Sequence, residues 1–299
     1  MAKSAKQSAK RVPSRQAKGR ALTIGLNSVD PKHYANWSGE LMACEADAED
    51  MADIARSRGF AVRTLLTRKA KRNAVAAEIR AAAKALQAKD IFMLSYSGHG
   101  GRVPDQNGDE KDLRDETWCL FDGELLDDEL LELWIGFRPG VRILVFSDSC
   151  HSGTVIRANY GALAASGALG AIMQRVPSSP LGVLNGFRAM PPEEAVRTYR
   201  KNQAFYDKLG LRARVSETQV GASVLLISGC QDNQYSSDGE FNGLFTARLK
   251  LSWNNGAFKG TYREFHRNIL DGMPPTQSPN WYTVGAADSA FLKQQPFTI

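Results

Sequence analysis

The chain has 299 residues, of which 43% are hydrophobic and 23% are charged, and its formal net charge is +6. This composition is ordinary for a globular protein with a large core. It excludes a membrane-spanning helix, because no apolar run approaches the roughly 18 residues required, and the N-terminus lacks the apolar segment of a secretory signal.

The basic charge is concentrated in residues 1–20, which carry seven Lys or Arg side chains and no acidic one. The rest of the chain is nearly neutral, with 31 basic and 32 acidic residues. Because the tail has few large apolar residues to repay its ordering entropy, we expect it to be disordered. Two roles are open for it: a solubilising tail, or an electrostatic arm for nucleic acid or acidic lipid.

From residue 21 onwards, apolar strands alternate with helices. Strands are predicted at 21–26, 60–66, 91–96 and from 141, and helices at 41–58, 71–88 and near 128–134. This alternation is typical of a parallel sheet covered by helices. The strand from Val141 contains the apolar run Ile143–Phe146, which predicts burial on both of its faces.

The pattern weakens over residues 158–221, which are rich in Gly, Ala, Ser, Pro and Arg. One helix is predicted there, from Pro192 to Leu209. So long a weakly patterned segment indicates a functional loop or a linker. Regular structure resumes with a strand at 223–228, helices near 244–251 and 262–270, and a last strand at 281–284.

Two predicted strands end in residues that suggest catalysis. One ends in Tyr96-Ser97-Gly98-His99-Gly100 and the other in Asp148-Ser149-Cys150. Ligands bind beyond the carboxyl ends of strands in α/β sheets, so His99 and Cys150 are a candidate base and nucleophile. An imidazole can take the thiol proton and later protonate a leaving amine. The glycines beside His99, including Gly100, let backbone N–H groups approach a substrate carbonyl, as an oxyanion hole requires.

Other cysteines and histidines are weaker candidates. The cysteines are scattered without CxxC spacing, so we expect reduced thiols and a cytoplasmic protein. Cys119 and Cys230 are expected to be buried structural residues. His151 is a rival base, but its adjacency to the candidate nucleophile points its side chain away. We expect His33 in a loop and His266 on a helix surface.

The sequence resembles the metacaspases and their bacterial orthocaspase relatives, which are caspase-like cysteine peptidases. The similar blocks are Tyr96–Gly100, Asp148–Gly153, Ala43–Ala48 and Ile227–Asp232. The signature QAC[RQG]G of caspases proper is absent. The resemblance covers most of residues 21–299 and implies a caspase-like three-layer α/β sandwich, with a mostly parallel central β-sheet covered by helices on both faces.

The resemblance also implies a division of the domain and a set of site residues. The division is a large-subunit-like part (21–157), a linker or insertion (158–221) and a small-subunit-like part (222–299). His99 is implied as the base and Cys150 as the nucleophile. The pocket for the residue before the scissile bond is implied to be lined by Cys44, Asp47, Ser97 and Asp148.

The chemistry of these four side chains is consistent with a pocket for a basic residue. Cys44 and Asp47 stand at i and i+3 of one predicted helix and project to one side. Two carboxylates at the end of a cleft suit Arg, or Lys, through charge-assisted hydrogen bonds. An aspartate-specific pocket would need basic residues instead. The alternative is that Asp47 is a surface charge and Asp148 a loop cap.

The acidic loop at residues 105–116 raises the question of calcium. It does not fit an EF-hand, because its glycine falls at the fourth position rather than the sixth and no flanking helix pair is evident. The resemblance matches Asp115, Asp127 and Asp128 to three carboxylates of the family's calcium site, but Arg157 replaces the fourth. Because a cation there would repel calcium, we expect no required cofactor and a solvated acidic loop, with calcium dependence left open.

These observations predict a cytoplasmic cysteine endopeptidase that cleaves proteins and peptides after Arg or Lys. Whether two chains associate cannot be read from the sequence itself, but the family resemblance implies a monomer. Self-processing is predicted in the linker, and the basic residues in it or directly before it include Arg157, Arg175, Arg188, Arg197, Arg200, Lys201, Arg212 and Arg214. A legumain- or clostripain-like peptidase is one alternative. Another is a catalytically idle caspase-like scaffold whose basic tail binds nucleic acid.

Overall fold

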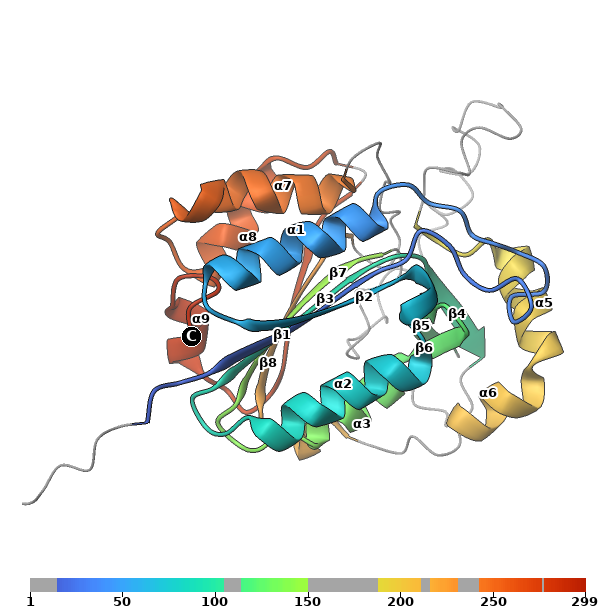
Figure 1. Cartoon of the computed structure of the whole chain (residues 1–299), viewed down its shortest axis with the longest axis horizontal. Helices are drawn as coiled ribbons and strands as arrows, with labels where there is room; N and C mark the ends of the chain where they lie inside the picture. Colours follow the sequence, from blue (N-terminus) through green and yellow to red (C-terminus); the bar gives the residue numbers. More distant parts are fainter. Residues whose placement is uncertain (1–14, 105–113, 150–187, 211–215, 231–241, 276) are drawn as a thin grey trace, which may run out of the picture.

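The computed structural model describes residues 15–104, 114–149, 188–210, 216–230, 242–275 and 277–299. Within them a central β-sheet lies between two layers of helices (Figure 1). The predicted three-layer α/β class is therefore confirmed. No helix in these ranges has both the length and the apolar character that crossing a membrane requires.

The central sheet has six strands in the order β2-β1-β3-β7-β8-β9. Its first five strands run parallel, and β9 is antiparallel to β8. In chain order the strands are β1 (Gly19–Gly25), β2 (Ala61–Leu66), β3 (Ile91–Ser97), β7 (Arg142–Asp148), β8 (Ser223–Ser228) and β9 (Asn280–Gly285). Strand β1 begins two residues before the predicted start, because Gly19 and Arg20 pair with Ile91 and Phe92.

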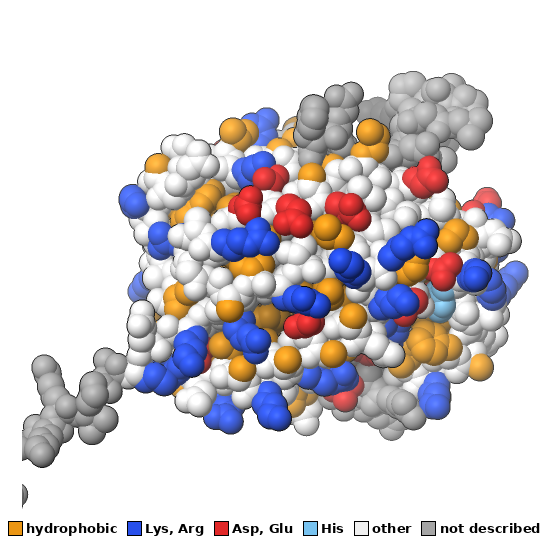
Figure 2. Space-filling model, viewed as in Figure 1, with side chains coloured by type: hydrophobic (Ala, Val, Ile, Leu, Met, Phe, Trp, Pro, Cys, Tyr) orange, Lys and Arg blue, Asp and Glu red, His pale blue; other side chains and the backbone are white. Residues whose placement is uncertain are grey.

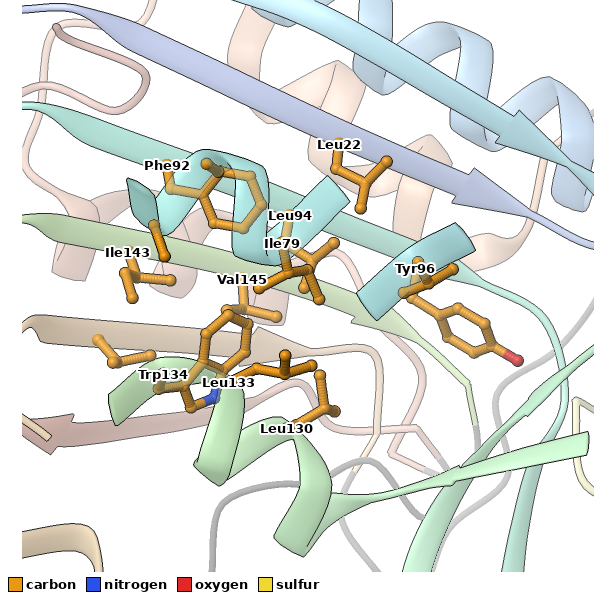
Figure 3. Close-up of a cluster of buried hydrophobic side chains, with 14 of the residues drawn as sticks. Leu22, Ile79, Phe92, Leu94, Tyr96, Leu130, Leu133, Trp134, Ile143 and Val145 are labelled. Atoms are coloured by element: carbon orange, nitrogen blue, oxygen red, sulfur yellow. The ribbon is translucent and has the colours of Figure 1, made fainter. Parts of the chain in front are cut away.

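Each face of the sheet is covered by its own helices, because side chains alternate across a strand. In Figure 3, Phe92 and Leu94 of β3 and Val145 of β7 face helices α2 and α3. On the other face, Met93 and Phe146 join the cluster that packs against α1, α7 and α8. The helices are α1 (Cys44–Ser57), α2 (Arg72–Ala85), α3 (Asp127–Ile135), α7 (Leu244–Trp253), α8 (Tyr262–Asp271) and α9 (Ser289–Lys293). Short 3-10 turns lie at Thr67–Lys69, Glu217–Gln219 and Asn254–Gly256.

A small antiparallel sheet that the sequence did not predict lies beyond the end of β3. It consists of β4 (Gly100–Pro104), β5 (Arg114–Leu120) and β6 (Gly123–Leu126). The prediction of a solvated acidic loop up to residue 116 is wrong at its end, because Asp115 and Glu116 are buried within β5. Acidic residues within a short strand hide the apolar alternation on which a strand prediction depends.

The helix predicted from Pro192 to Leu209 is two helices, α5 (Pro192–Lys201) and α6 (Gln203–Gly210). They break at Asn202, whose side-chain amide donates to the carbonyls of Thr198 and His33. Both helices lie beside the small sheet (Figure 1). The part of the predicted linker that the structure describes is therefore packed onto the body of the protein.

Candidate active site

The two strand ends that carry the candidate catalytic residues lie side by side. Strands β3 and β7 pair in parallel, with Ser97 opposite Asp148. The backbone N–H of Gly98 donates to the carbonyl oxygen of Asp148 at 3.4 Å. Cys150, the predicted nucleophile, follows Asp148 by two residues and lies outside the described residues, as do His151 and Arg157.

His99, the predicted base, is buried directly beyond β3. Its Nε2 lies 3.1 Å from the carbonyl oxygen of Gly39. Because a carbonyl only accepts, Nε2 carries the proton in this arrangement and Nδ1 is left with the lone pair that a general base needs. The indole of Trp37 packs on the imidazole, with the ring centroids 4.7 Å apart. A backbone carbonyl and an aromatic ring thus orient His99, and sequence reasoning identified neither.

Gly39 is constrained by this arrangement. Its φ of +53° is a left-handed conformation that favours glycine, and a Cβ there would lie 2.8 Å from the Trp37 ring and 3.1 Å from His99 Cδ2. We expect Gly39→Ala to displace the imidazole and to lower kcat for peptide hydrolysis about 10- to 100-fold, since small displacements of a catalytic group are costly.

A matched control for this prediction is Gly59→Ala. Gly59 also has a positive φ, +85°, but the nearest atom to its added Cβ is 3.8 Å away, on Ile299. Both variants carry the strain of a side chain at positive φ, whose cost thermal melting measures, but only Gly39→Ala also contacts Trp37 and His99. Equal kcat values for the two variants would contradict the positioning role of Gly39.

The acidic side chains predicted to line a pocket converge on one guanidinium, that of Arg188. Arg188 Nη2 lies 2.7 Å from Asp47 Oδ2, and Nη1 lies 2.8 Å from Asp148 Oδ2. Nη1 also donates to Ser97 Oγ at 2.8 Å. The Arg188 side chain is fully buried, with 0% exposed. This site therefore holds a desolvated cation between two buried carboxylates.

The fourth predicted pocket residue, Cys44, is the first residue of α1 and is fully buried one helical turn before Asp47. Its backbone carbonyl packs closely on the end of β1, where a Cβ added to Gly25 would lie 2.1 Å from the Cys44 oxygen. This contact seats the start of α1 against the sheet. The predicted structural cysteines Cys119 and Cys230 are both buried.

The N-terminus of α7 supports both carboxylates, a contribution that sequence reasoning missed. Asp47 accepts hydrogen bonds from Asn242 Nδ2 at 2.8 Å and from the backbone N–H of Gly243 at 3.1 Å. Asp148 Oδ2 accepts from Thr246 Oγ1 at 3.0 Å. A helix N-terminus presents unpaired N–H groups and a positive dipole end, so it stabilises negative charge.

The protonation of Asp47 in the pocket depends on whether a cation is bound there. Burial raises the pKa of the Asp47 carboxyl, the Arg188 guanidinium lowers it, and the Asp148 carboxylate raises it, with a net rise. Without a cation the carboxylates repel each other in a medium that solvates them poorly. The arrangement therefore favours a bound guanidinium.

The backbone beside His99 also meets Arg188. The N–H of Gly100 donates to the Arg188 carbonyl at 2.9 Å, and the N–H of Met190 donates to the Gly100 carbonyl at 2.8 Å. Gly100 and Ala189 thus form an isolated parallel bridge. Gly100, predicted as an oxyanion donor, therefore holds a carbonyl oxygen in this structure.

The predicted calcium ligands Asp115, Asp127 and Asp128 are buried where β5 meets the start of α3. Burial raises the pKa of Asp127 well above its usual range, and the neighbouring carboxylates of Asp115 and Asp128 raise it further. Within the described ranges, no three His, Cys, Asp or Glu side chains are arranged to hold a metal ion. We therefore derive no catalytic step through calcium.

Glu124 of β6 is a fully buried acid in the small sheet. Thr117 Oγ1 donates to its Oε2 at 2.5 Å. Burial raises the pKa of Glu124 to about 7, although hydrogen bonds from Thr117 and Tyr206 lower it. The folded protein therefore holds a proton here that the unfolded chain releases at a lower pH.

This raised pKa predicts a pH-dependent effect of Glu124→Gln on stability. Protonation of Glu124 favours folding fully below its unfolded pKa, and the benefit is lost as pH rises to about 7. The loss is of order 3 kcal/mol. We expect urea unfolding to show that Glu124→Gln gains stability relative to wild type between pH 5 and pH 8. The exposed Glu132→Gln should show no such gain, and a pH-independent difference for Glu124→Gln would contradict the assignment.

Comparison with known proteins places this chain in a family. Residues 18–294 match the caspase domain family. Metacaspase-1 of Mycosarcoma maydis is 30% identical over 86% of this chain and 68% of its own length. Metacaspase-1A of Aspergillus clavatus is 29% identical over 88% of this chain and 65% of its own length. The chain thus spans about two thirds of these curated relatives.

Two solved structures are similar to this one. The crystal structure of protein GSU0716 from Geobacter sulfurreducens is 56% identical, has a TM-score of 0.82, and covers 94% of this chain and 99% of its own. Caspase-1 from Spodoptera frugiperda shares the fold at 12% identity and a TM-score of 0.50, over 90% of this chain and 89% of its own.

The fold and the family match define the class: a caspase-like α/β protein of the cysteine peptidase type. The chain belongs to the caspase domain family, and its curated relatives are metacaspases. The predicted family is therefore confirmed, and with it the class of caspase-like cysteine peptidase.

Proposed function

We propose that the chain is a cysteine endopeptidase that cleaves peptide bonds after Arg or Lys. Cys150 is the nucleophile and His99 the base. One observation carries the specificity: a guanidinium lies fully buried between Asp47 and Asp148, at the strand ends that lead to the catalytic residues.

The proposed reaction uses Cys150, His99 and Gly100 in turn. His99 Nδ1 accepts the proton of the Cys150 thiol, and the thiolate attacks the carbonyl carbon of the substrate. The N–H of Gly100 donates to the oxygen that becomes negative. The imidazolium then protonates the leaving amine, and the imidazole activates the water that hydrolyses the thioester.

The pocket geometry favours Arg over Lys. The two terminal nitrogens of a guanidinium reach different carboxylates, Nη2 towards Asp47 and Nη1 towards Asp148. A lysine ammonium is a single point of charge and cannot span both partners in the same way. An Asp side chain would be repelled by both carboxylates. The expected order of cleavage is Arg, then Lys, with Asp excluded.

We test the nucleophile with a tagged peptide that carries Arg and a thiol-reactive electrophile at the scissile position. Mass spectrometry should locate the label on Cys150, and Cys150→Ser should stay unlabelled at that position. Labelling at another residue, or no labelling, would contradict the proposal and favour the alternative of a catalytically idle caspase-like scaffold. The experiment includes Arg188→Ala, whose pocket holds no guanidinium of its own.

We propose further that catalysis needs no cofactor and that the chain cleaves itself within the 158–221 linker. Hydrolysis of an Arg peptide is expected to be equal within about twofold in EDTA and in millimolar calcium. Activity that appears only with calcium would contradict this expectation, since binding of a required ion scales with its concentration.

The cytoplasmic location, the monomeric state and a role of the basic tail with nucleic acid or acidic lipid stay predictions from the sequence. On the face drawn in Figure 2, Lys and Arg side chains are interspersed with Asp and Glu. Most of the tail, residues 1–14, lies outside the described ranges.

A further inference from the structure

We infer that the unprocessed chain holds Arg188 in its own specificity pocket as a built-in substrate, and that Arg188–Ala189 is the bond it cuts first. Until that cut, the pocket is closed to other substrates. This inference rests on the proposed function and assigns both the position of self-cleavage and its consequence for activity.

The first support is the burial of the Arg188 side chain. A buried guanidinium is stable only when its charge is paired and its terminal nitrogens are hydrogen-bonded. Here it meets Asp47, Asp148 and Ser97, and its Nη1 also points to the Asp148 carbonyl at 3.3 Å. Arg197, a basic residue of the same predicted linker, instead pairs with Glu194 at the surface with its side chain 58% exposed.

The second support is the register of the backbone. Gly100 binds the Arg188 carbonyl through its N–H and the Met190 N–H through its carbonyl. The carbonyl held beside His99 is therefore that of the residue whose side chain fills the pocket. A substrate presents this same pair of features, so the bond between Arg188 and Ala189 corresponds to the bond that follows the pocket residue of a substrate.

The third support is the anchoring of the chain after that bond. Met190 is 4% exposed and packs in the cluster of Val29, Tyr34 and Cys119. Met190 is thus a positioning residue for Arg188 in the intact chain.

The helices that follow Met190 are also fixed. Tyr206 of α6 is buried, and its hydroxyl lies 2.6 Å from His33 Nε2. Further on, β8 pairs with β7 within the central sheet. Residues 189–299 should therefore stay bound to residues 1–188 after cleavage.

The closing of the pocket follows from close packing. A Cβ added to Gly243 would lie 2.4 to 2.6 Å from three atoms of the Arg188 guanidinium, so the cation fills the space against α7. A second Arg side chain cannot enter beside it. Once the peptide bond is hydrolysed, Arg188 loses its covalent link to the Met190 anchor and can leave as a product.

The chemistry balances with one water. The Cys150 thiolate bonds to the Arg188 carbonyl carbon, and the C–N bond to Ala189 breaks as its nitrogen takes a proton from His99. Water then hydrolyses the thioester, which frees the Arg188 carboxylate and restores the thiol.

The test uses purified full-length wild type, Cys150→Ala, Arg188→Ala and the surface control Arg197→Ala. We expect wild type and Arg197→Ala to yield a fragment that begins at Ala189, identified by intact mass and N-terminal sequencing. That fragment should co-elute with residues 1–188 in native gel filtration. Cys150→Ala and Arg188→Ala should yield no such fragment.

A locked variant tests the closed pocket. Ala189→Pro keeps Arg188 but replaces the leaving N–H by a proline nitrogen, so this chain should stay intact. We expect Arg188→Ala to hydrolyse a fluorogenic Arg peptide without a lag, at a rate at least tenfold above that of Ala189→Pro. Equal rates for the two intact variants would overturn the closed pocket.

Peptide hydrolysis tests the proposed function, and the appearance of an N-terminus at Ala189 tests the role of Arg188. Wild type that hydrolyses Arg peptides but never yields an N-terminus at Ala189 overturns this inference and leaves the proposed function standing. Absence of hydrolysis in every variant overturns the proposed function. Should Arg188→Ala not fold, Arg188→Lys decides: slower cleavage at the same bond supports the inference, and cleavage at another bond overturns it.

Discussion

Replacing His99 with alanine is expected to lower kcat/KM for a peptide with Arg before the scissile bond by about three to four orders of magnitude. Proton transfer by a positioned side chain contributes about 10²- to 10⁴-fold, and here one imidazole serves both the attack and the departure of the amine. Its orientation is set by the Gly39 carbonyl and the Trp37 ring. Steady-state kinetics on the purified variant measure the effect.

The chain offers a matched control in His266→Ala. His266 Nε2 also lies 3.1 Å from a backbone carbonyl, that of Pro279, and its ring also contacts a tryptophan, Trp281. It belongs to α8, one of the helices covering the sheet. We expect the kcat/KM of His266→Ala to stay within about twofold of wild type when both proteins are assayed at a temperature at which they are fully folded. If both variants lost activity equally, or if His99→Ala kept a tenth of it, His99 would not be the base.

Replacing Asp47 with asparagine is the second change with a large expected effect. The substitution keeps the shape of the side chain but leaves a bound guanidinium without one of its two carboxylates. Removing one partner of a buried ion pair costs about 3 to 5 kcal/mol, so we expect kcat/KM for Arg peptides to fall by at least two orders of magnitude. The loss should appear mainly in KM.

The control for Asp47 lies on the same helix. Asp53 is exposed and pairs with Arg56 at the surface, so Asp53→Asn should leave kcat/KM unchanged within about twofold. Asp47→Asn should also slow self-cleavage after Arg188, because the same carboxylate holds that side chain. If Asp47→Asn kept both the kcat/KM for Arg peptides and the rate of self-cleavage, Asp47 would not select the basic residue.

The sequence predicted the strands of the central sheet and most of the helices that cover it, because their apolar residues follow the spacing of a strand or a helix. Strands β3 and β7 are buried on both faces, so each contains an unbroken apolar run, Ile91–Leu94 and Ile143–Phe146, and polar residues follow each run. The side chains of Asp47, Ser97 and Asp148 do meet, as their places beside the strand ends suggested.

The sequence did not reveal the contacts that orient His99 or those that support Asp47 and Asp148, because they involve backbone groups and residues far apart in the chain. A loop carbonyl such as that of Gly39 carries no side-chain signal for its role. The backbone N–H groups of Gly243 and Thr246, at the start of α7, donate to Asp47 and Asp148, which lie 196 and 98 residues away in the chain. Arg188 was one of eight basic residues named in the linker or directly before it, and only the three-dimensional structure shows that its side chain lies between Asp47 and Asp148.

The most direct measurement compares three peptides that differ only in the residue before the scissile bond: Arg, Lys or Asp. Their kcat/KM values are measured with Arg188→Ala, whose pocket is free of its own cation, and with Cys150→Ala as the blank. We predict the order Arg, then Lys, with no cleavage after Asp. Cleavage after Asp while the Arg peptide stays intact would contradict a pocket built from Asp47 and Asp148.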